Sequence, residues 1–201
     1  MFSRLRRFSP ALVVAFAALS LSACGINSVP TAEEEAKAKW ADVQAQYQRR
    51  SNLIGNLVAT VKGAAKQEQD TLVRVTEARA KATSIQVSAD DLSNPGKVQQ
   101  FQEAQAALSQ SLGRLIATTE AYPDLKSNQN FLDLQSQLEG TENRIAVSIR
   151  DYNEAVRAYN TRIRTFPDAI GAKLIHGAKP MTPYQATTPG AEEAPKVDFG
   201  T

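Results

Sequence analysis

The chain has 201 residues, with 23 Lys and Arg against 21 Asp and Glu, one His and one Cys. A single cysteine excludes an internal disulfide, and with a lone histidine it excludes a Cys and His zinc site, so no metal is predicted. Removal of Arg4, Arg6 and Arg7 would leave 20 basic against 21 acidic side chains. That balance lacks the basic excess typical of nucleic-acid binding, so no nucleic-acid partner is expected.

Residues 1–23 have the layout of a secretory signal peptide. Three arginines precede an apolar run from Ala11 to Leu21, and the small residues Ser22 and Ala23 precede Cys24. The apolar run of about 11 residues is shorter than the roughly 20 that a spanning helix needs. The sequence Leu21-Ser22-Ala23-Cys24 resembles the bacterial lipobox, in which the cysteine is acylated and becomes the new N-terminus.

The lipobox predicts that Cys24 is a lipidation site carrying acyl chains such as palmitate. Several acyl chains anchor a protein firmly, because each buried methylene contributes about 0.8 kcal/mol. The alternative is an ordinary signal peptide with an incidental free cysteine. With the lipid, the protein would lie at the cell membrane. In an organism with two membranes, Gly25 replaces the aspartate that commonly causes inner-membrane retention, which favours an outer-membrane position facing the periplasm.

Residues 24–31 are expected to form the lipidated N-terminus and a tether, and a helix is expected to begin near residue 32. Its first turn would hold the acidic residues 33–35, which complement the positive end of the helix dipole. The rows of this helix are Trp40, Tyr47, Ile54, Val61, Glu68, Val75 and Ala82, and Val43, Arg50, Leu57, Ala64, Thr71, Ala78 and Ile85. Because the heptad phase continues across Gly55 and Gly63, the pattern favours one helix to about residue 85 over two antiparallel helices.

Two further helices are predicted before Pro167. Asn94 and Pro95 are typical of an N-cap followed by proline in the first turn, and Pro123 ends that helix. The next helix carries the repeat Phe131, Leu138, Ile145, Tyr152, Tyr159 and Phe166. The short connection at 122–127 predicts that these two helices are antiparallel neighbours.

The helical bundle domain therefore covers residues 32–167. Beyond it, frequent proline and glycine predict a partly docked tail over 168–184 and a disordered tail over 185–201. No strand-like alternation of useful length occurs. The predicted fold is all-α, an elongated antiparallel bundle of long helices with left-handed coiled-coil-type packing.

Motifs along residues 40–167 occur in a specific order. Among them are Leu53-Ile54-Gly55-Asn56-Leu57-Val58, Glu120-Ala121-Tyr122-Pro123-Asp124-Leu125-Lys126, Leu138-Glu139-Gly140-Thr141-Glu142-Asn143-Arg144-Ile145, and Tyr152-Asn153 with Tyr159-Asn160. Together they resemble the LemA family of bacterial envelope proteins. The resemblance implies a long helical bundle held at a membrane by its N-terminus, with no established enzymatic activity, cofactor or catalytic residue. This chain departs from most relatives in its lipobox, which replaces a transmembrane helix, and in Gly55, where proline is usual.

Glu68 is the one acidic residue on the main heptad row. A desolvated carboxylate there would have a raised pKa and would be a functional candidate. A buried ion pair with Arg50 or Arg144 is the commoner reason for such a residue, and it can fix the register of long helices. The two Tyr-Asn dipeptides are candidates for a binding surface, although packing of their rings is the more common role.

These features predict a non-enzymatic, lipid-anchored scaffold or interaction protein of the bacterial envelope. Its expected partners are the membrane and envelope proteins, with self-association left open and no cofactor. The alternative is a ligand-binding or catalytic envelope module with a polar site around Glu68 between helices. A third hypothesis is membrane remodelling by an amphipathic helix, but it is weakened because no predicted helix has a strongly cationic face.

Overall fold

The computed structural model describes residues 9–64 and 68–185, and it describes side chains over 27–63 and 68–185. Its elements are α1 (Ser9–Ala64), α2 (Gln69–Ser84), η2 (Ala89–Ser93), α3 (Pro95–Thr119), α4 (Pro123–Lys126), α5 (Gln129–Arg162), α6 (Asp168–Gly171) and η3 (Ala172–His176). No strand occurs in the described part of the chain. The prediction of an all-α fold is therefore confirmed.

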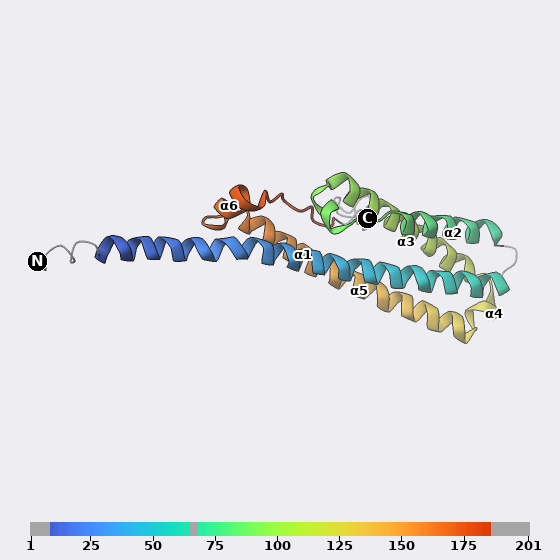
Figure 1. Cartoon of the computed structure of the whole chain (residues 1–201). Helices are drawn as coiled ribbons and strands as arrows, with labels where there is room; N and C mark the ends of the chain where they lie inside the picture. Colours follow the sequence, from blue (N-terminus) through green and yellow to red (C-terminus); the bar gives the residue numbers. More distant parts are fainter. Residues whose placement is uncertain (1–8, 65–67, 186–201) are drawn as a thin grey trace, which may run out of the picture.

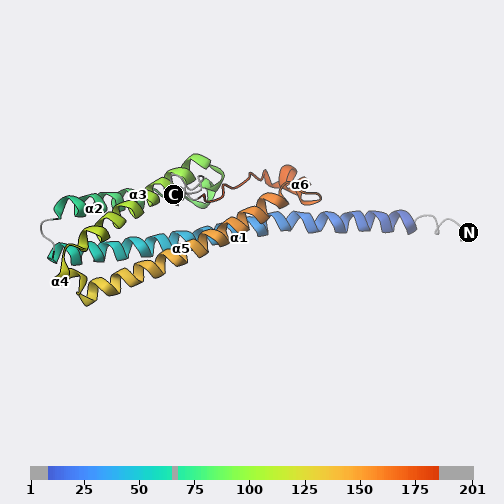
Figure 2. The same cartoon turned by 180° about the vertical axis from the view of Figure 1, so that it is seen from behind.

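The four long helices form an elongated antiparallel bundle. Helix α1 runs the length of the molecule, α2 folds back beside its distal end, α3 reverses again, and α5 returns along α1 (Figures 1 and 2). The main packing pairs are α1 with α5 and α2 with α3. The predicted elongated antiparallel bundle is thus confirmed, with four long helices in place of three.

The expectation of one helix from about 32 to 85 is wrong, because the chain reverses between α1 and α2. Trp40 in α1 donates a hydrogen bond from Nε1 to the carbonyl of Val87 at 2.8 Å, and Arg79 in α2 donates from Nε to the carbonyl of Ser51 at 2.8 Å. An unbroken heptad phase gives each of two antiparallel helices a buried face as readily as it gives one to a single helix. The phase therefore could not reveal the reversal.

Helix α1 also begins earlier than expected. The stretch predicted as a tether, from residue 25 to residue 31, is helical, with Pro30 inside the helix and Val29 fully buried. Val29 is buried because it joins a cluster that includes Tyr159 on α5 and Ala172 on η3. Packing against the C-terminal part of the chain thus stabilises helix on the N-terminal side of residues 33–35, where the sequence predicts that the helix begins.

The later helix boundaries agree with the sequence. The side chain of Asn94 accepts a hydrogen bond from the Gly96 amide at 3.1 Å, and Pro95 lies in the first turn of α3. Helix α5 ends at Arg162, before Pro167. The predicted neighbours are different, however, because α3 packs along α2 and α5 packs along α1. A short connection fixes the direction of two helices but leaves open which third helix each one contacts.

The heptad rows supply the core, which consists of two apolar clusters. One surrounds Trp40 at the N-terminal half of the bundle, and the other surrounds Leu57 at the distal half. Phe166 is the exception among the predicted row residues of α5, since it is 79% exposed. It lies beyond the end of α5, where the helical repeat no longer determines which way a side chain points.

Candidate functional site

A polar layer centred on Arg50 separates the two apolar clusters. Arg50 is only 2% exposed, and on its heptad row it lies between the buried residues Val43 and Leu57. Its guanidinium carbon is 4.8 Å from the centroid of the Tyr47 ring, which is cation–π geometry. The layer therefore places a permanent positive charge inside the bundle.

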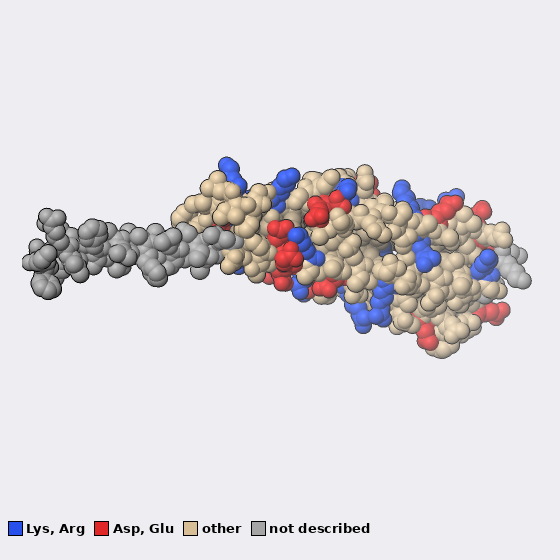
Figure 3. All heavy atoms as spheres, in the orientation of Figure 1, with Lys and Arg blue, Asp and Glu red and all other residues tan. Residues whose placement is uncertain are grey.

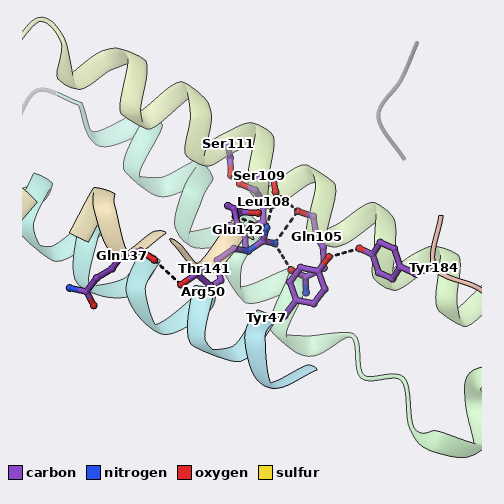
Figure 4. Close-up of polar contacts among 10 residues, drawn as sticks. All are labelled: Tyr47, Arg50, Gln105, Leu108, Ser109, Ser111, Gln137, Thr141, Glu142 and Tyr184. Atoms are coloured by element: carbon purple, nitrogen blue, oxygen red, sulfur yellow. Dashed lines mark hydrogen bonds and ion pairs between the residues drawn. The ribbon is translucent and has the colours of Figure 1, made fainter. Parts of the chain in front are cut away.

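The Arg50 guanidinium joins α1 to two other helices (Figure 4). Its Nη1 donates to Ser109 Oγ of α3 at 2.9 Å and to Glu142 Oε1 of α5 at 3.1 Å. Its Nη2 donates to Gln105 Oε1 of α3 at 2.6 Å. The Glu142 side chain is 46% exposed, so the ion pair has one buried and one solvated partner. Arg50 thus ties three helices together at one level of the rod.

The Arg50 layer also reaches the C-terminal tail. The hydroxyls of Tyr47 and Tyr184 are 2.5 Å apart, and their rings stack with centroids 6.3 Å apart. Burial is the main cause that raises the pKa of both tyrosines, so both hydroxyls remain protonated at neutral pH. One hydroxyl donates to the other, and this bond joins α1 to the tail.

The two Tyr-Asn dipeptides of α5 hold the tail by its backbone. Asn160 donates from Nδ2 to the Met181 carbonyl at 2.8 Å and accepts from the Met181 amide at 2.9 Å. Asn153 makes the same pair with the carbonyl and amide of Tyr184, at 2.9 and 2.7 Å. We name the surface formed by Tyr152, Asn153, Tyr159 and Asn160 the tail ladder.

The tyrosines of the tail ladder bind carbonyls of the same segment. Tyr152 donates to the Thr182 carbonyl at 2.8 Å, and Tyr159 donates to the Lys179 carbonyl at 3.1 Å. Burial raises the pKa of both hydroxyls, which keeps them as donors. The tail ladder thus binds the main chain of an extended tail segment. The Tyr-Asn dipeptides therefore both form a binding surface and pack in the core, since their rings are also buried.

The structure does not bring Glu68, Arg50 and Arg144 together. Glu68 is the half-buried residue before α2, and its Oε1 accepts a hydrogen bond from the Tyr122 hydroxyl at 2.9 Å. This bond is the main cause that raises the pKa of Tyr122. Arg144 is exposed on α5. The expected ion pair of Glu68 with either arginine is therefore replaced by the pair of Arg50 with Glu142.

From the sequence we did not predict that Glu142 pairs with Arg50 or that the tail ladder binds the backbone of the tail. Glu142 is not part of the repeat that runs from Phe131 to Phe166, and its half-exposed carboxylate is reached by the Arg50 side chain from α1. A signal existed in Arg50 itself, because a cation on a buried row needs an acceptor from a neighbouring helix. The lipidation prediction at Cys24 falls on a side chain outside the described residues.

A groove lies beside the Arg50 layer, between α1, α2 and α3. Its volume is about 380 Å³, and its lining includes Gln44, Tyr47, Gln105 and Leu108. Among the described residues, no group of three or more His, Cys, Asp or Glu side chains could hold a metal ion. In the same part of the chain, no helix combines the length and apolarity needed to cross a bilayer. The polar groups described above are arranged to join helices to one another and to the tail.

The fold and these contacts define a class of protein, an elongated helical bundle that clamps its own C-terminal segment. The sequence pattern of the LemA family matches residues 39–199, and this chain belongs to the LemA family. Comparable relatives include Magnetosome protein MamQ 2 of Paramagnetospirillum magneticum, which is 29% identical over an alignment of 171 positions that covers 77% of this chain and 62% of the relative.

Two other relatives show similar levels of identity. Magnetosome protein MamQ of Magnetospirillum gryphiswaldense is 27% identical over an alignment of 186 positions that covers 82% of this chain and 68% of the relative. Protein LemA of Metamycoplasma hominis is 28% identical over 133 residues, 66% of this chain and 57% of the relative. The chain thus spans about three fifths of the length of most of these curated relatives, 62% for the MamQ 2 protein.

Proposed function

We propose that this LemA-family protein is a non-enzymatic, lipid-anchored scaffold or interaction protein of the bacterial cell envelope. The observation that carries the proposal is the use of its polar groups. Arg50, Glu68, Tyr152 and Tyr159 each form a hydrogen bond within the chain, and these bonds join helix to helix or helix to tail. Groups committed in this way support a rigid rod that presents its outer faces to partners.

The anchor is Cys24, acylated at the lipobox. Helix α1 continues without a break from the region of Cys24 into the bundle, so a lipid there would hold the whole rod at the membrane. In the Cys24→Ala variant we expect the membrane-bound fraction to fall strongly and the acylated N-terminal peptide to disappear from mass spectra. Ser28→Ala, four residues further on, is the control and keeps both. A membrane fraction unchanged by Cys24→Ala argues against lipid anchoring.

Placement in the outer membrane, facing the periplasm, is proposed for an organism with two membranes. It rests on Gly25 after the acylated cysteine. Gly25→Asp is expected to move the protein from the outer-membrane to the inner-membrane fraction of a density gradient. If the wild-type chain is already in the inner-membrane fraction, the proposed placement is wrong, while lipid anchoring stands.

The proposed partners are other envelope proteins that bind the outer faces of the helices. Photo-crosslinking amino acids at exposed positions of α2 and α5, such as Val73 and Val147, would test this in cells. We expect one set of crosslinked partners that is lost with Cys24→Ala, because the partners and the anchored rod would then lie in different places. Crosslinks that are insensitive to the anchor would contradict an envelope scaffold. A catalytic site around Glu68 is not proposed, since its carboxylate accepts the Tyr122 hydroxyl and so joins the start of α2 to the loop after α3.

A further inference from the structure

The segment after α5 carries the most exposed of the large apolar side chains among the described residues. They are Phe166, Ile170, Leu174 and Ile175, which are 79%, 54%, 78% and 60% exposed, and we name them the 166–175 patch. Large apolar side chains gathered on one exposed segment are typical of a surface that contacts a membrane or another molecule. In Figure 3 the surface over α6 is mostly tan, with blue atoms at its edge.

The 166–175 patch lies beside the part of α1 that directly follows the proposed lipid anchor at Cys24. Helix α6 and η3 pack on α1, and Ala172 and Val29 belong to the same buried cluster. Arg162, just before the patch, donates from Nη1 to the Ser28 carbonyl at 3.3 Å. Ser28 is four residues after Cys24, which along an α-helix is a rise of about 6 Å. The patch and the acylated residue would therefore lie at nearly the same height.

The charges around the patch favour an anionic surface. Residues 162–179 contain four basic side chains, Arg162, Arg164, Lys173 and Lys179, and one acidic side chain, Asp168. All four basic residues are exposed. The nearby acidic run Glu33 to Glu35 is partly balanced within its own helix, because Lys37 pairs with Glu33 at 2.8 Å and with Glu34 at 3.0 Å, and Lys39 lies 3.9 Å from Glu35.

We propose that the 166–175 patch inserts into the headgroup region of the bilayer beside the lipid anchor and holds the rod at a fixed orientation. Apolar side chains with basic neighbours bind such an interface by burying apolar area and by attraction to anionic lipids. This inference rests on the lipid anchor of the proposed function. It adds a second contact, which would orient a rod that a lipid alone leaves free to tilt.

The test uses the full lipidated chain with one introduced thiol, Leu174→Cys, labelled with an environment-sensitive fluorophore. Acylation of Cys24 leaves the new cysteine as the only free thiol, and lack of labelling of the wild-type chain verifies this. Val73→Cys is the matched control, since Val73 is also exposed but lies on the distal helix α2. The protein is reconstituted in vesicles of phosphatidylethanolamine and phosphatidylglycerol that carry nitroxide lipids.

We expect roughly threefold stronger nitroxide quenching at residue 174 than at residue 73, with blue-shifted emission, because interfacial side chains lie about 5–10 Å deep. The double variant Lys173→Glu with Lys179→Glu should reduce quenching in these vesicles more than in vesicles of phosphatidylcholine alone. Equal quenching at residues 174 and 73, in protein that floats with the vesicles, overturns this inference and leaves the anchor intact.

Two further outcomes separate the alternatives. If the protein does not float with vesicles and its wild-type form labels at Cys24, the anchor and the inference both fail. A blue shift of the residue 174 label without vesicles that grows with protein concentration would identify a second copy of the chain as the occupant. That result would overturn the bilayer as the partner of the patch.

Discussion

Arg50 shows how a single residue organises the bundle. Its side chain is buried, and each of its two terminal nitrogens contacts a partner on another helix. A buried cation of this kind adds little net stability, because removing it from water costs about as much as its contacts return. It does penalise any shift of α3 or α5 along α1, since a shift would leave the charge without acceptors. The Arg50 layer thus sets the register of three helices.

Arg50→Ala is expected to lower the free energy of unfolding by about 3 kcal/mol, because it removes the stacking on Tyr47 and leaves a cavity and unpaired acceptors. Glu142→Ala should cost about 1 kcal/mol, since its half-exposed carboxylate is already solvated. Urea unfolding followed by circular dichroism measures both values. Arg144→Ala, an exposed arginine on α5, is the control and should stay within about 0.5 kcal/mol of wild type. Equal effects of the two arginine variants would contradict the register role.

The contacts of Asp91, in the turn between α2 and α3, predict that the stability of the fold depends on pH. The ammonium of Lys97, 2.6 Å away, is the main cause that lowers the Asp91 pKa from 3.8 to about 2, with hydrogen bonds from Ser88 adding to it. Because the folded-state pKa is depressed, the carboxylate stabilises the fold above about pH 4, and this contribution is lost as the pH falls toward 2.

Asp91→Asn should therefore lower the melting temperature at neutral pH and converge with wild type as the pH approaches 2. Thermal unfolding across this pH range measures the difference. Asp90→Asn is the matched control, because Asp90 is the exposed neighbour in the same turn. A difference between wild type and Asp91→Asn that stays constant with pH would show that the carboxylate charge has no role.

Helix α5 has two roles, because it packs in the core and also binds the tail. Its heptad residues pack against α1, and the asparagines next to Tyr152 and Tyr159 bind the tail. The asparagines are seven residues apart, so they lie on the same side of the helix and contact two points of one extended segment. The Met181 side chain is buried as a result, and the Thr182 amide donates to the Leu92 carbonyl at 2.8 Å. The tail thereby connects α5 to η2.

Asn160→Ala or Asn153→Ala should loosen residues 179–185 without unfolding the bundle. Each variant removes two hydrogen bonds of about 1 kcal/mol each, so we expect at least roughly tenfold faster hydrogen exchange at the Met181 and Tyr184 amides. Exchange followed by mass spectrometry measures this change. Asn143→Ala, at an exposed position of α5, should leave the tail protected. Unchanged protection in both ladder variants would mean that side-chain packing alone holds the tail.

For the whole molecule, the decisive feature is the reversal between α1 and α2. It brings Gln44, in the middle of α1, to within 3.0 Å of the Val87 carbonyl. A single straight helix would separate residues 44 and 88 by roughly 66 Å. The reversal makes the bundle shorter and thicker and creates the groove between α1, α2 and α3.

Spin labels at Gln44→Cys and Ser88→Cys, in a Cys24→Ala background, should lie far closer than that separation. Pulsed electron paramagnetic resonance measures the distance between the two spin labels. The pair Gln44→Cys with Lys62→Cys lies on α1 in either arrangement and should give about 27 Å along the helix axis. A long distance for the first pair together with the expected distance for the second would contradict the reversal.

Much of this fold could be predicted from the sequence because its determinants are local. The heptad rows fix which faces of the helices are buried, and Asn94, Pro95 and Pro167 mark helix boundaries through the conformations that they favour or forbid. The predicted rows are indeed buried at Trp40 and Tyr152. The sequence motif around Cys24 likewise predicts lipidation on its own, since it requires no fold.

Other features were decided by the tertiary structure alone. Local periodicity is the same for one long helix and for two antiparallel ones, so only long-range packing selects the reversal before Gln69. Glu142 becomes the partner of Arg50, and Asn153 binds the tail, because the packing of α5 on α1 places them there. Helix periodicity determines which face a residue occupies, whereas the partner on that face depends on how distant segments pack.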